Sequence, residues 1–166
     1  MRKVLVTGSA GFIGFHLTLK LLNKYNVFGV DNLNDYYDPT IKNDRLSKLK
    51  KEKNFRFYKL DISNLNSLKK IIYKNKIKYI VHLAAQAGVR YSIDHPEKYV
   101  SSNLVGFFNV LEVARIFKIK HMIFASTSSV YGNNKKFPLK EDYDTDKPLS
   151  FYAATKKSNE VMAHSY

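Results

Sequence analysis

Continuous apolar runs alternate with helical periodicities along the whole chain. In the intervening segments, apolar residues recur every three or four positions, as on one face of a helix. Such alternation predicts an α/β fold, a doubly wound parallel sheet with helices on both faces, as in Rossmann-type domains. The apolar runs, which are typical of buried strands, occupy five segments: 3–7, 26–31, 55–61, 78–85 and 120–126.

The helical segments follow from spacing and from capping residues. Serine and asparagine are preferred caps, and proline suits the first helical position. No internal repeat, low-complexity tract or linker divides the chain, so we expect residues 1–166 to form one domain. The chain stops inside the last predicted helix, so we also expect it to be truncated there. Helices are predicted at five places: from Ile13 to Leu21, up to about Glu52, from Ser63 or Asn64 to Lys74, from Pro96 to Phe117, and from Phe151 onward.

The composition is that of a folded domain. The 166 residues are 45% hydrophobic and 14% aromatic, and no window offers the roughly 18 consecutive apolar residues of a membrane span. Arg2 and Lys3 precede an apolar stretch, as in a signal peptide, but Gly8 and His16 interrupt it and no cleavage site follows. The chain has no cysteine, which excludes disulfides, thiol catalysis and thiolate metal sites. We therefore expect a cytoplasmic protein with no membrane partner and no metal.

The net charge of +14 raises the possibility of nucleic-acid binding. The lysines are interleaved with apolar residues, as in 48–53 and 68–79, so they indicate solvated faces of packed elements. Arginine, which reads bases and clamps phosphates, is scarce beside lysine. We expect no nucleic-acid partner; a binder driven by charge alone would be released from DNA at moderate salt.

Three glycines at a spacing of three follow the first strand. Gly8, Gly11 and Gly14 form a variant of the dinucleotide-binding fingerprint between a strand and a helix. Gly8 permits a tight turn, Gly11 a close approach of backbone to a pyrophosphate, and Gly14 close packing of the helix. Phe12 and Ile13 occupy the first helical turn, whose positive end would face the phosphates. An idle flexible turn is the alternative.

An acidic residue at the end of the second strand supports the cofactor interpretation. Asp31 lies 23 residues after Gly8, close to the spacing of the carboxylate that binds both adenosine ribose hydroxyls. Because a carboxylate repels a 2'-phosphate, NAD is predicted over NADP. Asp61 has a second possible role as a helix cap, and His82 is expected to be a core histidine. Further cofactor contacts are expected from residues at the ends of the strands: Asn32, Asp61, Ile62, Leu83, Ala84, Ala85 and Ala87.

A tyrosine and a lysine one helical turn apart are candidates for catalysis. Tyr152 and Lys156 are at i and i+4 on the last helix. Tyrosine, with a pKa of about 10, becomes a base at neutral pH only if its phenolate is stabilised, as an ammonium and a nicotinamide ring would do. Ser126 and the following hydroxyls lie just beyond the fifth strand, at the edge where ligands bind doubly wound sheets. A polar loop without function is the alternative for these hydroxyls.

Six motifs in this order resemble the extended short-chain dehydrogenase/reductase family, and specifically its nucleotide-sugar epimerases and dehydratases. The six are TGSAGFIG, Asp31, HLAAQAGVRYS, SSNLVGFFNVLE, STSSVYG and YAATKKSNE, and they cover essentially the whole chain. Within the family, DNLNDYYDP, QAGVRYS and FYAATKK are most similar to UDP-glucuronate 4-epimerases. The resemblance implies NAD as cofactor, a UDP-linked sugar as substrate and a homodimer. It also implies a second domain for the sugar nucleotide that is absent from this chain, which would then be inactive alone.

The resemblance also assigns roles to individual residues. It implies that Tyr152 is the acid and base at the sugar O4 and that Lys156 lowers its pKa and binds the nicotinamide ribose. Thr127, 25 residues before Tyr152, matches the family residue that hydrogen-bonds O4. Asn103 matches a helical asparagine packed near the cofactor, in a structural rather than a chemical role.

Two serines distinguish epimerisation from dehydration. The family's 4,6-dehydratases carry an Asp-Glu pair after the catalytic threonine, because removing water needs an acid and a base. Ser128 and Ser129 take those places here. We expect these serines, with Thr127 and Arg90, to contact a sugar carboxylate instead. A non-catalytic NAD-binding regulator remains the second alternative, although it would not need Thr127, Tyr152 and Lys156 together.

Overall fold

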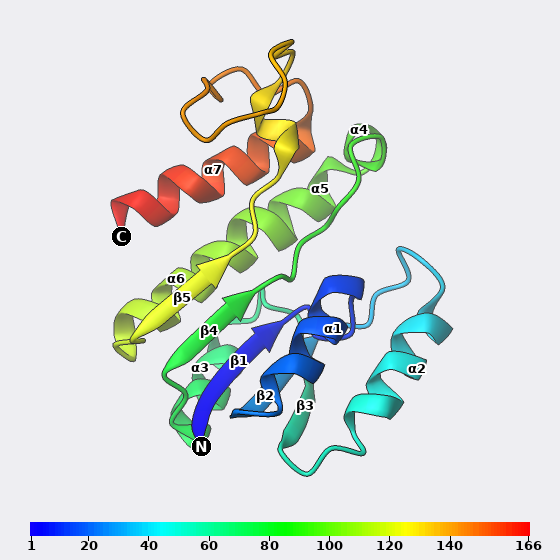
Figure 1. The fold of residues 1–166 in the computed structure, drawn as a ribbon, viewed down its shortest axis with the longest axis vertical. Coiled ribbons are helices and arrows are strands. Elements are labelled where there is room, and N and C mark those ends of the chain that lie inside the picture. The colour runs from blue at the N-terminus through cyan, green and yellow to red at the C-terminus, as the bar shows by residue number, and fades with distance from the viewer.

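Five parallel strands form one sheet in the computed structural model, which describes residues 1–166 (Figure 1). Their order across the sheet is β3-β2-β1-β4-β5. From β1 the chain adds β2 and β3 on one side, and it then adds β4 and β5 on the other side of β1. The strand order thus reverses between β1 and β4, and a crevice forms beyond the carboxyl ends of these two strands. The strands are β1 (Arg2–Thr7), β2 (Tyr25–Asp31), β3 (Phe55–Lys59), β4 (Tyr79–His82) and β5 (His121–Phe124).

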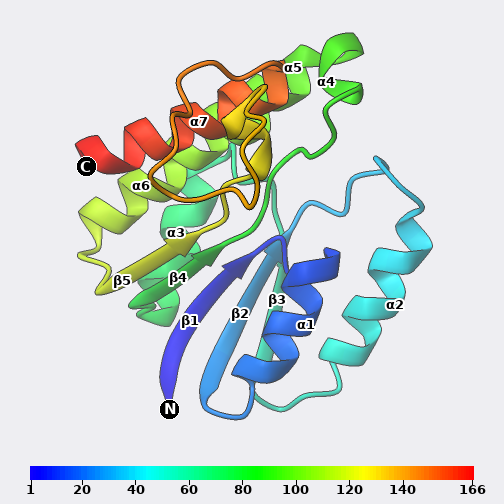
Figure 2. The same ribbon diagram turned by 45° about the horizontal axis from the view of Figure 1, so that its top comes forward.

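Helices cover both faces of this sheet (Figure 2). On one face α1 and α2 bury Phe15, Leu46 and Leu49 against β1, β2 and β3. On the other face α3 and α6 bury Leu68 and Val110, with their neighbours, against the same sheet. The predicted doubly wound α/β fold is confirmed. The helices are α1 (Phe12–Leu21), α2 (Pro39–Leu49), α3 (Leu65–Asn75), α4 (Tyr91–Asp94), α5 (Pro96–Tyr99), α6 (Gly106–Ile116) and α7 (Phe151–Ser165).

Three predicted strands are shorter in the structure. The apolar runs predicted at 55–61, 78–85 and 120–126 leave the sheet at Lys59, His82 and Phe124. The residues beyond these points line the crevice rather than pair with a strand, and all of them except Asp61 are apolar or small. Periodicity alone does not separate these two causes of an apolar run.

The helix predicted from Pro96 to Phe117 forms as three consecutive helical segments, and the hydrogen-bonding pattern changes between them. A π-helical segment, η1 (Val100–Val105), separates α5 from α6, and a short 3₁₀ segment, η2 (Ser128–Tyr131), follows β5. A π-helical turn is frequent at functional sites. Here η1 carries Asn103, which is 1% exposed. No helix of this structure has both the length and the apolar character needed to cross a membrane.

Candidate active site

The glycine turn packs backbone against backbone. Gly8 has a φ of +72°, and a Cβ there would lie 2.8 Å from the amide nitrogen of Ala84. A Cβ on Gly14 would lie 2.0 Å from the carbonyl oxygen of Gly8. The third glycine therefore lets α1 pack closely on the turn itself. No side chain caps the N-terminus of α1 at Gly11, which leaves its first N–H groups free for an anion.

Replacing Gly14 with alanine should therefore destabilise the domain. Backbone on both sides of the clash gives the methyl group no room, so we expect a loss of about 2 kcal/mol in the free energy of unfolding. Gly11→Ala is the matched control, because its Cβ would lie 3.1 Å from the same Gly8 oxygen. Urea denaturation of both variants tests this, and equal stability of the two would contradict it.

The adenosine half of the crevice is centred on Asp31. This carboxylate is 8% exposed and accepts hydrogen bonds from the backbone N–H of Ala10 at 3.1 Å and of Leu33 at 2.9 Å. Each oxygen keeps a lone pair for a ribose hydroxyl. The same pocket is lined by the other residues predicted for this part of the cofactor site: Gly8, Gly11, Asn32, Asp61, Ile62, Leu83, Ala84, Ala85 and Ala87.

Asp61 binds the loop next to the pocket rather than capping a helix. It accepts hydrogen bonds from Asn32 Nδ2 and from the N–H of Ser63, both at 2.9 Å. Asn64 caps α3 by accepting a hydrogen bond from the N–H of Ser67 at 3.0 Å. The helix-capping alternative for Asp61 is therefore wrong, and Asn64 is the cap.

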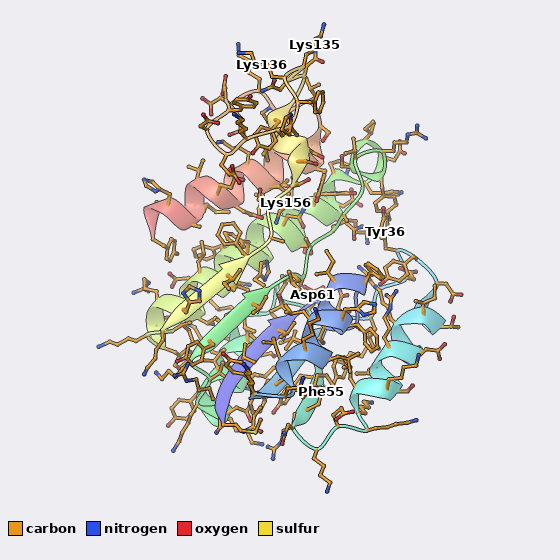
Figure 3. All side chains as sticks on the ribbon, in the orientation of Figure 1. Tyr36, Phe55, Asp61, Lys135, Lys136 and Lys156 are labelled. Atoms are coloured by element: carbon orange, nitrogen blue, oxygen red, sulfur yellow. The ribbon has the colours of Figure 1, made fainter.

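The other half of the crevice contains the candidate catalytic pair. Tyr152 and Lys156 line it from α7, opposite Phe12 and Ile13, with Ser126 beside them. Both halves share the glycine turn and the segment 83–87, so they form one continuous groove. Asp61 and Lys156 lie in its two halves, whereas Phe55 lies at the opposite end of the sheet (Figure 3).

Lys156 is a buried cation without a partner. It is 3% exposed and makes no hydrogen bond or ion pair within the chain, and burial lowers its pKa to about 8 against the opposing charge of Glu160. His82 lies in the same pocket and forms a 2.8 Å hydrogen bond through Nδ1 with Thr7 Oγ1. Burial, with the charge of Lys156, lowers the pKa of His82 to about 3. His82 is thus a neutral core histidine, as predicted.

Hydrogen bonds from α4 and η1, and an aromatic contact from α5, fix the position of α7. The N–H of Tyr152 donates to Ser92 Oγ at 3.2 Å, and the ring of Tyr152 lies edge-on to that of Tyr99 at 6.0 Å. Asn103 Nδ2 donates to Thr155 Oγ1 at 3.1 Å, and Asn159 Nδ2 donates to the Asn103 carbonyl at 2.7 Å. These contacts place Tyr152 and Lys156 toward the crevice.

Asn103 acts as a structural link and does not line the crevice. Its Oδ1 accepts from the N–H of Gln86 at 2.8 Å, and its Nδ2 donates to the Gln86 carbonyl at 3.0 Å. It thereby joins the segment 83–87 to η1 and α7. The structural role implied for Asn103 agrees with these contacts, and its cofactor contact stays a prediction; its neighbour Ser102 lines the adenosine pocket.

The predicted substrate contacts lie outside the groove. Thr127 is half-buried and accepts a hydrogen bond from the N–H of Ser129 at 3.2 Å, whereas Ser128 is exposed at the start of η2. Arg90 is exposed just before α4. None of these four residues lines either half of the crevice; Ser126 does, and it donates a hydrogen bond to Glu160 of α7.

Sequence reasoning missed several residues that build this site. Thr155 and Asn159 are buried on α7 beside Tyr152 and Lys156, so the four polar residues follow the i, i+3, i+4, i+7 spacing of a buried helical face. The sequence signal for Thr155 and Asn159 is that polar residues occupy helix positions where the spacing predicts apolar, buried ones. For Ser92 and Tyr99 there was none, because their partners are distant in sequence.

A glycine turn into a helix, a carboxylate at the end of β2 and a Tyr-x-x-x-Lys pair with a buried lysine define the class of short-chain dehydrogenase/reductase domains. Within this class, the family model of GDP-mannose 4,6 dehydratase matches residues 5–166, and the chain belongs to this family.

Individual relatives narrow the similarity. The chain is 49% identical over 163 residues to a UDP-glucuronate 4-epimerase of Thermodesulfobacterium geofontis, covering 98% of this chain and 50% of that protein. It is 52% identical to Protein CapI of Staphylococcus aureus, covering 99% and 49%. A crystal structure of UDP-glucuronic acid 4-epimerase from Bacillus cereus with UDP-glucuronic acid and NAD superposes with a TM-score of 0.91 at 38% identity, covering 99% of this chain and 52% of that one. The chain thus spans about half the length of these relatives.

Proposed function

We propose that residues 1–166 supply the cofactor site and the catalytic side chains of an NAD-dependent 4-epimerase acting on UDP-glucuronate. The observation that carries the proposal is the position of Tyr152 and Lys156 across the groove from the uncapped start of α1. The relatives that are UDP-glucuronate 4-epimerases support the choice of substrate.

The residues of the groove fit the dinucleotide along its length. Asp31 would bind the ribose hydroxyls of the adenosine half, and the free N–H groups of Phe12 and Ile13 would bind the pyrophosphate. Lys156, a buried ammonium without a partner, would donate to the hydroxyls of the second ribose. When bound, NAD supplies a reversible acceptor for the hydride at C4 of the sugar.

Tyr152 and Lys156 share the acid–base work. The phenolate of Tyr152 accepts the proton of the sugar O4 as the C4–H bond breaks, and it returns that proton to the keto oxygen after the sugar has turned over. Lys156 stabilises the phenolate through its positive charge. Thr127 would donate or accept a hydrogen bond at O4.

Ser128 and Ser129 are proposed to bind the sugar carboxylate with Arg90, because they replace the acid–base pair that dehydration requires. Replacing both serines with alanine should raise the KM for UDP-glucuronate about tenfold through the loss of hydrogen bonds to a charged group, with little change for UDP-glucose. Steady-state kinetics with the two substrates test this. An unchanged KM for UDP-glucuronate would remove these serines from the site.

The reaction is tested on an enzyme of the relatives' full length that carries residues 1–166. Proton NMR of UDP-glucuronate should show conversion to UDP-galacturonate without loss of water. Formation of a 4-keto-6-deoxy sugar from a UDP- or GDP-hexose would favour the dehydratase alternative, and NAD binding without turnover of any sugar would favour the regulator.

We expect residues 1–166 alone to bind NAD weakly or not at all and to turn over no sugar. We also propose that the full-length enzyme is a cytoplasmic homodimer.

A further inference from the structure

Lys42 is a buried cation that the proposed reaction does not use. It lies on α2, is 5% exposed, and lines the adenosine half of the groove together with Asp31. Lysine is almost never fully buried without a partner or a function. Lys156 is the other buried lysine, and it belongs to the candidate catalytic pair.

The contacts of Lys42 leave one donor free. Its Nζ donates to the carbonyl oxygen of Asn34 at 2.8 Å and to Asn34 Oδ1, and it lies 4.6 Å from the centre of the Tyr37 ring. An ammonium group has three N–H donors, so two are used by Asn34. Lys42 and Asn34 both line the groove, so this ammonium lies at the ligand site with one N–H group that Asn34 does not engage.

The charge of Lys42 is tied to that of Asp31. Burial lowers the pKa of Lys42, while the charges of Asp31 and Asp35 act against this. A carboxylate at the end of β2 on its own repels a 2'-phosphate, and a cation nearby attracts one. This pocket contains both charges, so Asp31 alone does not determine the discrimination between NAD and NADP.

We propose that Lys42 is a specificity-determining residue at the adenosine ribose, whose free N–H group binds the 2'-phosphate of NADP and offsets the repulsion from Asp31. The inference rests on the proposed cofactor site. The site would then bind both dinucleotides, and its preference for NAD over NADP would be smaller than that of a site with Asp31 and no lysine.

The test is the ratio of the dissociation constants for NADP and NAD, measured by titrating an enzyme of the relatives' full length that carries residues 1–166 with each dinucleotide. Lys42→Met keeps the aliphatic stem and removes the charge. It should raise the ratio about tenfold or more, as expected for a hydrogen bond to a charged group. Lys42→Arg keeps the positive charge and presents a guanidinium suited to phosphate, so the ratio should not rise. Lys48→Met, an exposed position on the same helix, is the matched control and should change neither constant.

Asp31→Asn completes a double-mutant cycle. Alone it should favour NADP, and combined with Lys42→Met that gain should disappear. Equal weakening of NAD and NADP by Lys42→Met would overturn the inference, since Lys42 would then only anchor the loop through Asn34. An unchanged ratio would overturn it as well. If the wild-type full-length enzyme bound neither dinucleotide, the proposed cofactor site would itself be wrong; NAD binding with a ratio insensitive to Lys42 would refute the role of Lys42 alone.

Discussion

Replacing Tyr152 with phenylalanine should lower the rate of UDP-glucuronate epimerisation by about 10³-fold in the full-length enzyme. The substitution removes the only group proposed to exchange a proton with O4, and general acid–base catalysis contributes an effect of this size. The edge-on contact of the ring with Tyr99 and the hydrogen bond from its backbone N–H to Ser92 do not depend on the hydroxyl. The loss should therefore appear in kcat, with the dissociation constant for NAD changed by less than about threefold.

Initial rates measured by NMR, together with NAD titration, separate these effects. Tyr73→Phe is a suitable control, because Tyr73 is 76% exposed on α3, away from the groove. A Tyr152→Phe enzyme that kept a tenth of the wild-type rate would show that another group moves the proton.

Replacing Lys156 with methionine should make the unliganded chain more stable. Burial lowers the pKa of Lys156 from its ordinary value of 10.5 to about 8. The charged lysine therefore costs the folded state about 3 kcal/mol at pH 7, and an apolar side chain of similar length avoids that cost. The same substitution should abolish epimerisation, because the phenolate of Tyr152 loses its neighbouring cation.

The gain in stability has a defined pH window. Between pH 8 and 10.5 the unfolded chain binds the lysine proton while the folded chain has released it, so the stability of the wild type rises with pH. The advantage of Lys156→Met should be complete below pH 8 and should vanish above pH 10.5. Urea unfolding at pH 7 and at pH 10 measures it. Lys157→Met, whose lysine pairs with Asp146 and Glu160, is the control and should not stabilise the chain. A Lys156→Met variant less stable than the wild type at pH 7 would contradict the argument.

The elements were predictable because their signals are local. Residues close together in the sequence specify where β1 ends near Gly8 and where β2 ends at Asp31. The same is true of the helix face that carries Tyr152 and Lys156. By contrast, the link from Asn103 to Gln86 and Thr155 joins three elements that are far apart in sequence, so no local pattern encodes it.

The same limit applies to the charges and to the strand ends. Lys42 is one of many lysines in the sequence, and only tertiary packing shows that it is buried beside Asp31. Residues 83–85 continue the apolar run that predicts a strand, but β4 ends at His82 and these residues line the crevice. An apolar run results from either cause, so the sequence does not distinguish them.

Helix α7 packs on the helical layer formed by α5, η1 and α6, and Ser92, Tyr99 and Asn103 contact its side chains and backbone. Conservative substitutions in the strands should therefore leave the position of Tyr152 unchanged. Substitutions at Ser92, Tyr99 or Asn103 should shift α7 and Tyr152 with it. In a population of variants, tolerance would be high at conservative changes of strand residues such as Val4 and Ile80 and low at Asn103. A deep mutational scan measures this tolerance at every position. We expect tolerance to depend on whether a residue belongs to the helical layer that contacts α7, and not on its distance from the sugar.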